Sequence, residues 1–313
     1  MSDIIVSIIC NTYNHGDYIC KCLEGFVTQK TEYLFEILVH DDASTDNTPE
    51  IIHEYEKKYP ELIFPICQTE NQFSKGIHPI LAVQCPRARG KYIAFCEGDD
   101  YWCDPKKLQK QISFLESHPE YSGSVHNVMT VDRDDNVLFK NTFGDHERDI
   151  EIDGTLRFPQ TSSFVMKNPM KDQSAEGREI ASKLFCTDNS FELYMAKTGK
   201  IRFFPEYMSH YRLVTDSGDS HSARKKRTNI TDFWIENELS LYRQVQAYHL
   251  DLDISQHIFK NMYVYPLMFL LRHPNSANLA LFLKARNNLP FSEWKTIKLA
   301  VSYFIEKVRF RMG

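Results

Sequence analysis

Three acidic side chains lie within four positions of one another in residues 91–104, KYIAFCEGDDYWCD. Glu97, Asp99 and Asp100 directly follow a short apolar run that predicts a buried strand. Of two adjacent acids, one can hold a hard divalent cation while the other accepts hydrogen bonds from ligand hydroxyls. Mg²⁺ and Mn²⁺ take one or two carboxylates and leave their other positions to water and substrate phosphates. The pattern therefore predicts cleavage at a nucleotide diphosphate, with the cation neutralising charge on the leaving group.

A second pair of acids, Asp41 and Asp42, favours this interpretation over a solvated turn, which Gly and Asp also form. The pair ends another predicted strand, and loops at the carboxyl ends of neighbouring parallel strands converge on one crevice. The chain has no G-x-G-x-x-G motif, and QCPRARGK lacks the first glycine of a Walker loop. A Rossmann dehydrogenase or a P-loop ATPase is therefore disfavoured.

The elements that must position these acids alternate between strand and helix through the first hundred residues. Apolar runs predict strands at 4–10, 35–41, 62–67 and 91–96, and helix signals predict helices at 19–27, 49–58 and 78–85. This order is typical of an α/β layer with a mainly parallel sheet.

Beyond residue 104 the pattern is more varied. It predicts a helix at 105–119, strands at 121–131 and 159–166, a helix at 187–199, and short strands at 200–204 and 207–212. Residues 132–153 predict a loop or a small hairpin. From about residue 229 the chain is expected to be helical, with breaks at Pro274 and Pro290.

The composition is that of a globular protein, with 313 residues, 42% hydrophobic and 25% charged. A net charge of −5 gives no sign of a nucleic-acid binder. Eight cysteines without a C-x-x-C pair predict free thiols rather than a zinc site. The N-terminus does not resemble a signal peptide, and no apolar run is long enough to span a bilayer. A cytoplasmic protein is expected.

Three segments carry a family resemblance: VSIICNTYNHGDYICKCL, ILVHDDASTDNT and GKYIAFCEGDDYWCDPKKLQKQ. In this order and spacing they resemble the family 2 glycosyltransferases of the GT-A fold, especially bacterial enzymes of capsule, lipopolysaccharide and exopolysaccharide assembly. The resemblance covers roughly the first 215 residues. It implies a GT-A catalytic domain over 1–225, with a nucleotide-binding half (1–104) and an acceptor half (105–225), followed by a helical region over 226–313.

The resemblance also implies roles for the polar strand ends. Thr12, Tyr13 and Asn14 would line the nucleoside pocket, and Asp42 would accept from the base. Asp99 would lie against the ribose, and Asp100 would bind Mn²⁺ or Mg²⁺. Glu97 stands where many members carry aspartate, so its role is open. Tyr101 and Trp102 shape the donor sugar pocket or, equally, pack under the sheet.

The acceptor side would supply the catalytic base. Asp188, in a segment resembling the family's base-bearing helix, is the candidate if Thr187 rather than Asp188 caps the helix. Thr161, Ser162 and Ser163 are candidates for the acceptor border. His210 and His221, with His221 preferred, are candidates for a further metal ligand or phosphate contact; surface histidine is the alternative. The run RKKR at 224–227 would close over phosphates or form a solvated face.

The C-terminal segment from Lys284 to Gly313 carries seven Lys/Arg and two Glu. Helical spacing places one apolar stripe along it, made of Trp294, Ile297, Val301, Phe304, Ile305 and Val308. Packing of the stripe on the catalytic domain or a second subunit is favoured. Docking on the inner face of an anionic membrane, where a polyprenyl-linked acceptor would lie, is the alternative.

The predicted function is an inverting, metal-dependent transfer of a sugar from a nucleotide-diphosphate sugar, with uridine as the expected base. The acceptor would be a saccharide or a lipid-linked molecule of cell-surface polysaccharide synthesis. A sugar nucleotidyltransferase is the rival enzyme, but no Gly- and Arg-rich phosphate loop follows the first strand. A degenerate scaffolding protein is the rival without catalysis.

Overall fold

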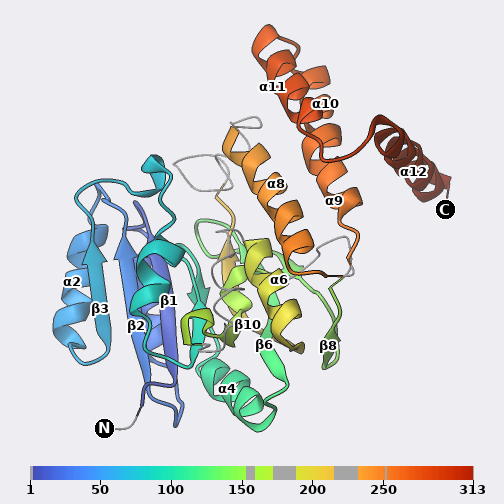
Figure 1. Ribbon diagram of the computed structural model, residues 1–313. Coiled ribbons are helices and arrows are strands. Elements are labelled where there is room, and N and C mark those ends of the chain that lie inside the picture. Colours follow the sequence, from blue (N-terminus) through green and yellow to red (C-terminus); the bar gives the residue numbers. More distant parts are fainter. Residues whose placement is uncertain (1–2, 153–158, 172–187, 215–231, 251, 313) are drawn as a thin grey trace. The chain divides into compact units, whose positions relative to one another are not determined.

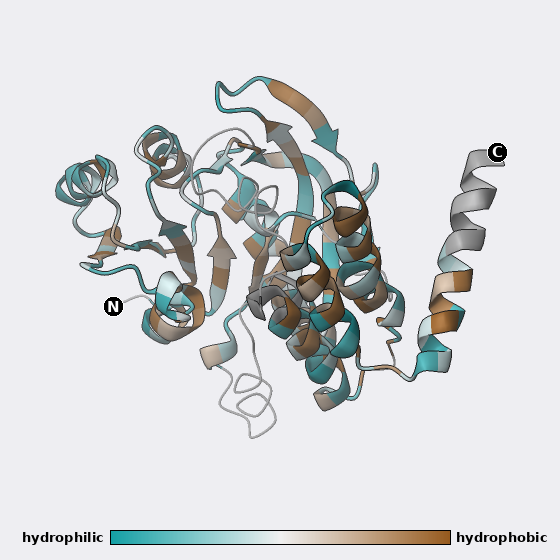
Figure 2. Ribbon diagram, turned by 90° about the horizontal axis from the view of Figure 1, so that it is seen from above, coloured by the Kyte–Doolittle hydropathy of each residue, from teal (hydrophilic) through white to brown (hydrophobic). Residues whose placement is uncertain are grey.

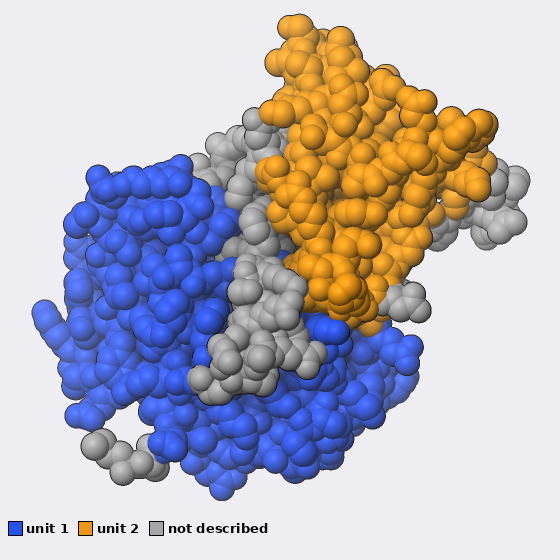
Figure 3. Space-filling view, in the orientation of Figure 1, with its two compact units in different colours: residues 1–151, 158–220 blue, residues 152–157, 221–313 orange. Residues whose placement is uncertain are grey.

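The computed structural model describes residues 3–152, 159–171, 188–214, 232–250 and 252–312 (Figure 1). The chain forms two compact units (Figure 3). Unit 1 comprises residues 1–151 and 158–220, and unit 2 comprises residues 152–157 and 221–313. The predicted domain boundary at residue 225 lies outside the described residues.

Unit 1 is built on a mixed sheet whose main path, among the described residues, runs β3-β2-β1-β4-β9-β6-β10-β5 (Figure 1). The strands are β1 (Val6–Thr12), β2 (Phe35–Asp41), β3 (Ile63–Cys67), β4 (Tyr92–Phe95), β5 (Tyr101–Trp102), β6 (Tyr121–Val131), β7 (Val137–Asn141), β8 (Arg148–Ile150), β9 (Val165–Lys167) and β10 (Lys200–Arg212). Strands β1 to β4 pair in parallel, and so do β6 and β10. Strand β9 pairs antiparallel with β4 and β6, and β5 pairs antiparallel with β10. The predicted mainly parallel sheet is confirmed.

Helices cover both faces of this sheet. They are α1 (Ile19–Val27), α2 (Thr48–Lys58), α3 (Cys85–Arg87), α4 (Lys107–Ser117) and α6 (Asp188–Thr198), with short turns η1 (Phe73–Lys75), η2 (Ile80–Gln84), η3 (Thr161–Ser163) and η4 (Pro169–Lys171). Alternate residues of β1, from Val6 to Cys10, point to the face covered by α1, α2 and α4, where the main core forms. On the other face, Phe191 of α6 lies 4.9 Å from Phe95 of β4 between ring centroids. In Figure 2 the strands carry hydrophobic colouring, and hydrophobic and hydrophilic colours alternate along the helices.

Several predicted elements differ in detail from the observed ones. Residues 200–212 form one long strand rather than two short ones, because bulges after Phe204 and Tyr207 keep the chain in register with β6 across Pro205. The predicted strand at 159–166 is a 3₁₀ turn, η3, followed by β9. The predicted helix at 78–85 is the π-helical turn η2 continuing into α3. The predicted hairpin excursion is present as β7 and β8.

Unit 2 is helical, as predicted. Its helices are α8 (Asp232–Ala247), α9 (Ser255–Phe259), η5 (Lys260–Val264), α10 (Tyr265–Arg272), α11 (Ser276–Asn287) and α12 (Glu293–Met312). The expected breaks fall between helices, since Pro274 lies between α10 and α11 and Pro290 between α11 and α12. Asn275 caps α11 by accepting from the Asn278 amide at 2.8 Å. Among the described helices, none is long and apolar enough to cross a membrane.

Candidate functional site

The loops that follow β1 and β2 are held together by backbone and side-chain hydrogen bonds. The Asp42 amide donates to the Thr12 carbonyl at 3.0 Å. The Asn14 amide donates to Ser44 Oγ, and Asn14 Oδ1 accepts from the Thr45 amide, each at 2.8 Å. Asn14 adopts a left-handed backbone with φ of 54°, which asparagine tolerates better than most residues. The predicted nucleoside residues of β1 therefore lie beside the first acidic strand end.

The loop that follows β4 contacts the end of β1. The Gly98 amide donates to the Asn11 carbonyl at 2.9 Å. A Cβ at residue 98 would come within 2.5 Å of Thr12 Oγ1, so only glycine allows this approach. The convergence of the three polar strand ends, predicted from the strand order, is confirmed. It brings Glu97, Asp99 and Asp100 next to Thr12.

The three acids of this loop differ in burial. Glu97 is exposed and Asp99 is half-buried, with its Oδ2 lying 3.8 Å from His15 Nε2. Asp100 is 4% exposed, and its Oδ1 accepts from the Arg212 amide at 2.8 Å. Burial, followed by the neighbouring charge of Asp99, holds the pKa of Asp100 well above its usual range. The arrangement concentrates negative charge where a cation would relieve the repulsion.

The acids at the end of β2 also make structural hydrogen bonds. Asp42 accepts from the Gln72 amide at 2.7 Å and the Phe73 amide at 3.0 Å, one on each oxygen, so it fixes the start of η1. Asp41 is 1% exposed and accepts from the amide and hydroxyl of Ser44. Burial raises the pKa of Asp41. The predicted contact of Asp42 with a base stays a prediction, and it would use the lone pairs that the two amides leave.

Polar atoms without partners surround the converging loops. Asn11 Oδ1, Thr12 Oγ1 and His15 Nδ1 are buried and have no hydrogen-bond partner among the described residues. Thr12 Oγ1 and His15 Nδ1 both lie beside Gly98, whereas Asn11 points to the opposite face of the sheet from Thr12. Buried polar atoms are almost always hydrogen-bonded in folded proteins, so the two atoms beside Gly98 indicate a bound molecule or water. His15 was not among the predicted site residues. Its position within NTYNHG, one residue beyond the motif, was the signal that could have found it.

Arg212, at the end of β10, is the main site residue that the sequence did not reveal. Its side chain is 2% exposed, and its Nε donates to the Asp99 carbonyl at 2.9 Å. The rest of the guanidinium bonds the turn between β6 and β7, through Asp135 Oδ1 at 2.6 Å and the carbonyls of Asp132 and Arg133. The only feature of the local sequence that points to Arg212 is its position as the last residue of a predicted strand. Arg212 thus fixes the acidic loop through hydrogen bonds to the Asp99 carbonyl and the Asp100 carboxyl group.

Replacing Arg212 by lysine is expected to raise the KM for the donor at least tenfold and to change kcat less. Lysine keeps the charge but cannot reproduce the fork of five donors, so the Asp99 carbonyl loses its fixed partner. Steady-state kinetics with the donor varied would measure this. The control is Arg202→Lys on the same strand, which alters the contacts with Glu147, Asp149 and the Phe114 ring and none with the acidic loop. Equal effects of the two substitutions would contradict a positioning role for Arg212.

The aromatic residues that follow the acidic loop pack against the protein. Trp102 is 3% exposed, and its Nε1 donates to the Ser162 carbonyl at 3.2 Å. Tyr101 stacks on His210 with ring centroids 4.5 Å apart, and Lys21 Nζ lies 4.0 Å from the Tyr101 ring centre. Packing is therefore observed for both aromatics, and a contact with donor sugar stays a prediction. Burial lowers the pKa of His210, which favours the neutral ring that a metal requires.

Beneath Trp102 lies a fully buried lysine. Lys107 Nζ is 4.5 Å from the Trp102 ring centre and donates to Gln111 Oε1 at 2.6 Å. Burial lowers the pKa of Lys107 to about 7. The Gln111 amide in turn donates to the carbonyls of Ser124 and Ser163, which ties α4 to the middle of the sheet.

The predicted acceptor-side residues are placed only in part. Asp188 is the first residue of α6, and Thr187, the alternative cap, lies outside the described residues. The Asp188 side chain, His221 and the run 224–227 also lie outside them. Ser162 and Ser163 are buried in η3, where Ser162 Oγ lies 3.0 Å from Ser209 Oγ. Thr161 is half-buried, and its predicted place at the acceptor border stays a prediction.

A divalent cation fits the carboxylates of the acidic loop. Asp100 is a buried carboxylate beside another acid, and hard oxygen ligands of this kind suit Mg²⁺ or Mn²⁺. The described residues contain no ready-made group of three or more His, Cys, Asp or Glu that could hold a metal. A cation bound here would therefore share its coordination with substrate and water, as Mg²⁺ usually does.

Comparisons with known proteins identify the family of the chain. The family described as Glycosyl transferase family 2 matches residues 7–175. An uncharacterised protein of Mycobacterium tuberculosis is 37% identical over 239 residues, covering 73% of this chain and 63% of that protein. The poly(ribitol-phosphate) beta-glucosyltransferase of Bacillus spizizenii is 37% identical over 99 residues, 31% of this chain and 15% of that protein. The chain thus spans less than two thirds of the length of these relatives.

A structural relative extends the comparison beyond the matched segment. S. aureus TarS 1–349 in complex with UDP-GlcNAc aligns with a TM-score of 0.63 at 16% sequence identity, covering 91% of this chain and 82% of TarS 1–349. At this identity the likeness concerns the fold.

Proposed function

The chain belongs to glycosyl transferase family 2 and has the GT-A fold, and on that basis we propose that it transfers a sugar from a nucleotide-diphosphate sugar, with inversion, in a metal-dependent reaction. The observation that carries the proposal is the meeting of three strand ends around unpartnered polar atoms. Thr12 and His15, beside Gly98, supply the unpartnered groups, and Asp99 and Asp100 of the same loop supply the carboxylates. Such a crevice at the carboxyl ends of parallel strands is the usual nucleotide position in α/β sheets.

Donor binding would use both sides of the crevice. The loop from Thr12 to Asn14 and the free lone pairs of Asp42 would contact the nucleoside. Asp99, with His15 3.8 Å away, would accept from the ribose hydroxyls. Uridine is the proposed base, since TarS of the same fold was solved with UDP-GlcNAc. Tyr101 and Trp102 pack on the buried side of the loop, and a contact of these aromatics with the donor sugar would be an additional role.

Asp100 would hold the cation, with Glu97 or Asp99 nearby and His221 as a further candidate ligand. The cation would supply charge neutralisation of the diphosphate leaving group. Arg212 would act indirectly, because its guanidinium binds the Asp99 carbonyl and its amide binds Asp100. These two hydrogen bonds would hold the Asp100 carboxylate in a fixed position beside the donor.

Asp188 would be the catalytic base. At the start of α6 it would take the proton from an acceptor hydroxyl as the oxygen attacks the anomeric carbon. The anomeric carbon–oxygen bond to the diphosphate breaks in the same displacement, which inverts the centre. The acceptor is proposed to be a saccharide or lipid-linked molecule of cell-surface polysaccharide synthesis. This class is supported by the poly(ribitol-phosphate) beta-glucosyltransferase among the relatives.

Thermal unfolding with a panel of nucleotide diphosphates and their sugars tests the proposal. UDP or a UDP-sugar with Mn²⁺ is expected to raise Tm by several degrees, because a ligand at about 100 times its Kd stabilises the native state by about 2.7 kcal/mol. EDTA should remove most of the shift, and CDP or GDP should give less. If no nucleotide shifts Tm with metal present, the converging loops are architecture and a scaffolding role takes precedence.

A further inference from the structure

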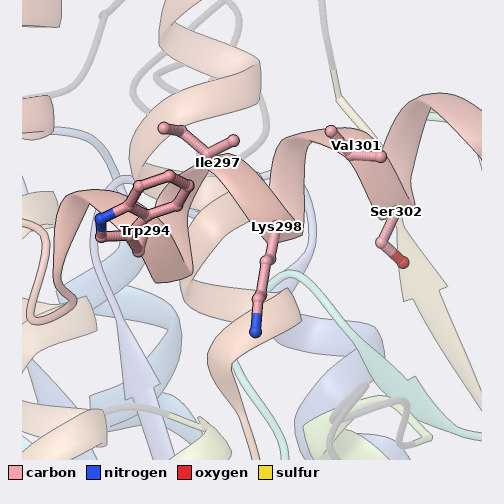
Figure 4. Close-up of a pocket in the computed structure, with 5 residues that line it drawn as sticks. All are labelled: Trp294, Ile297, Lys298, Val301 and Ser302. Atoms are coloured by element: carbon pink, nitrogen blue, oxygen red, sulfur yellow. The ribbon is translucent and has the colours of Figure 1, made fainter.

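Helix α12 of unit 2 exposes large apolar side chains along one face. Trp294, Ile297 and Val301 are 76%, 53% and 54% exposed. Their spacing of three and four residues places them in one row on the helix. Figure 4 shows that Trp294, Ile297, Lys298, Val301 and Ser302 line a single hollow. We call Trp294, Ile297, Lys298 and Val301 the docking face.

The opposite face of α12 accounts for its packing within unit 2. Leu299 is 9% exposed and forms a small core with Phe259 and Val264. Ala300 and Tyr303 pack against the same core. The helix is therefore held by residues outside the predicted stripe. Trp294, Ile297 and Val301 are exposed within unit 2, so packing of the stripe on the catalytic domain or on a second subunit stays a prediction. The side chains of Phe304, Ile305 and Val308 lie outside the described ones.

Positive charge accompanies the exposed apolar row. Lys298 lines the hollow itself and makes no ion pair within the described part of the chain. Lys295 is 44% exposed in its side chain, and its Nζ is 3.8 Å from Asp253 Oδ1, a loose pair at the surface. From Lys260 to the last residue the sequence has nine Lys/Arg and two Glu, although the whole chain has a net charge of −5. Unit 2 thus ends in a basic segment on an acidic protein.

We propose that the docking face binds the surface of an anionic lipid bilayer. Tryptophan is favoured at membrane–water interfaces, where its ring is apolar and its N–H can remain hydrated. Lysines beside an apolar row can extend their amines to lipid phosphates while their methylene stems stay in contact with acyl chains. Ile297 and Val301 would enter the interface between them. The helix would lie in the plane of the membrane without crossing it.

The same charges disfavour a second copy of the chain as the occupant. A two-fold symmetric contact pairs the same patch on both subunits. Two docking faces brought together would bring both copies of Lys298 and Lys295 into one interface, and like charges within an interface are unfavourable. An anionic lipid surface complements the basic face instead. The proposal does not depend on the proposed donor chemistry, because lipid binding is measured without any sugar nucleotide.

Flotation of the full chain with vesicles tests the proposal. Phosphatidylcholine vesicles containing phosphatidylglycerol are expected to bind at least tenfold more protein than pure phosphatidylcholine vesicles. Binding should fall as salt screens the lysines. The substitution Lys295→Glu combined with Lys298→Glu is expected to weaken binding at least tenfold, since each basic side chain near an anionic surface contributes about fivefold.

A second variant probes the apolar part of the docking face. Trp294→Ser, Ile297→Ser and Val301→Ser together should reduce binding at least tenfold, because they remove the groups that would be buried in the interface. Phe139→Ser is the control, since Phe139 is 53% exposed on β7 and should leave binding unchanged. Circular dichroism would verify that each variant keeps its helices and melts as the wild type does.

Three results would overturn the proposal. The wild-type chain could bind anionic and neutral vesicles equally weakly. The folded serine or glutamate variants could bind as the wild type does. Light scattering could show a dimer that the serine variant dissociates, which would assign the face to a second copy of the chain. Retained nucleotide-induced stabilisation in either variant would show that a loss of vesicle binding is separate from the donor site.

Discussion

Replacing Asp100 by asparagine is expected to abolish metal-dependent donor binding while leaving the protein at least as stable as the wild type. Asparagine keeps the shape, and its oxygen can still accept from the Arg212 amide. The substitution removes a buried carboxyl group beside Asp99; burial holds the pKa of Asp100 well above its usual range, so its charged form is disfavoured in the protein alone. If Asp100 lowers the stability of the protein and is nevertheless required for ligand binding, it behaves as functional-site residues typically do.

Calorimetric titration of UDP in the presence of Mn²⁺ would measure the first part of this expectation, and thermal unfolding the second. Asp104→Asn is the matched control. Asp104 belongs to the same segment, but its carboxylate accepts only from the Lys106 amide at the start of α4, at 2.8 Å. It should bind donor as the wild type does. Unchanged Mn²⁺-dependent binding by the Asp100 variant would exclude this residue from the metal site.

Replacing Asp188 by asparagine should lower kcat by about 10²–10⁴-fold and leave donor affinity unchanged. An amide cannot take a proton from the acceptor hydroxyl, whereas the donor side of the crevice is untouched. Initial rates with saturating donor and acceptor would give kcat, and the thermal shift with UDP and Mn²⁺ would report donor affinity. Asparagine is as good as aspartate at a helix start, so a capping role alone predicts no loss.

Glu192 provides the control, because it lies one turn further along α6 and is 4% exposed. Glu192→Gln is expected to keep turnover within a few fold of the wild type. If Glu192→Gln rather than Asp188→Asn lowers kcat, the base lies one helical turn from the predicted position. If neither substitution lowers kcat, the base does not come from α6.

Local patterns were sufficient to predict most of unit 1. The run from Val6 to Cys10 is buried at every position and apolar except at Ser7, as expected for a strand covered on both faces, and α1 shows a clear helical periodicity. Because the first four strands are parallel, their polar ends had to meet at one edge. The positions of Thr12, Asp42 and the acidic loop followed from these two facts.

Long-range contacts were beyond such patterns. Nothing local distinguishes Arg212 from any arginine at a strand end, since its partners lie far away in the sequence. The continuity of β10 through Pro205 likewise depends on its pairing with β6. For Trp102, sequence could name two environments but could not choose between them, because burial depends on which element covers the strand.

The bonds of Arg212 also bear on how the site is assembled during folding. Arg212 is 112 and 113 positions from its partners Asp100 and Asp99 in the acidic loop. It is 77 positions from Asp135 in the turn after β6. Contacts of such separation form late, because closing long loops costs chain entropy before any contact repays it. Residues 1–104 contain the predicted nucleoside contacts and the acidic loop, yet without β10 they lack Arg212, which fixes that loop. We therefore expect the ability to bind donor to arise only in a late stage of the folding of unit 1.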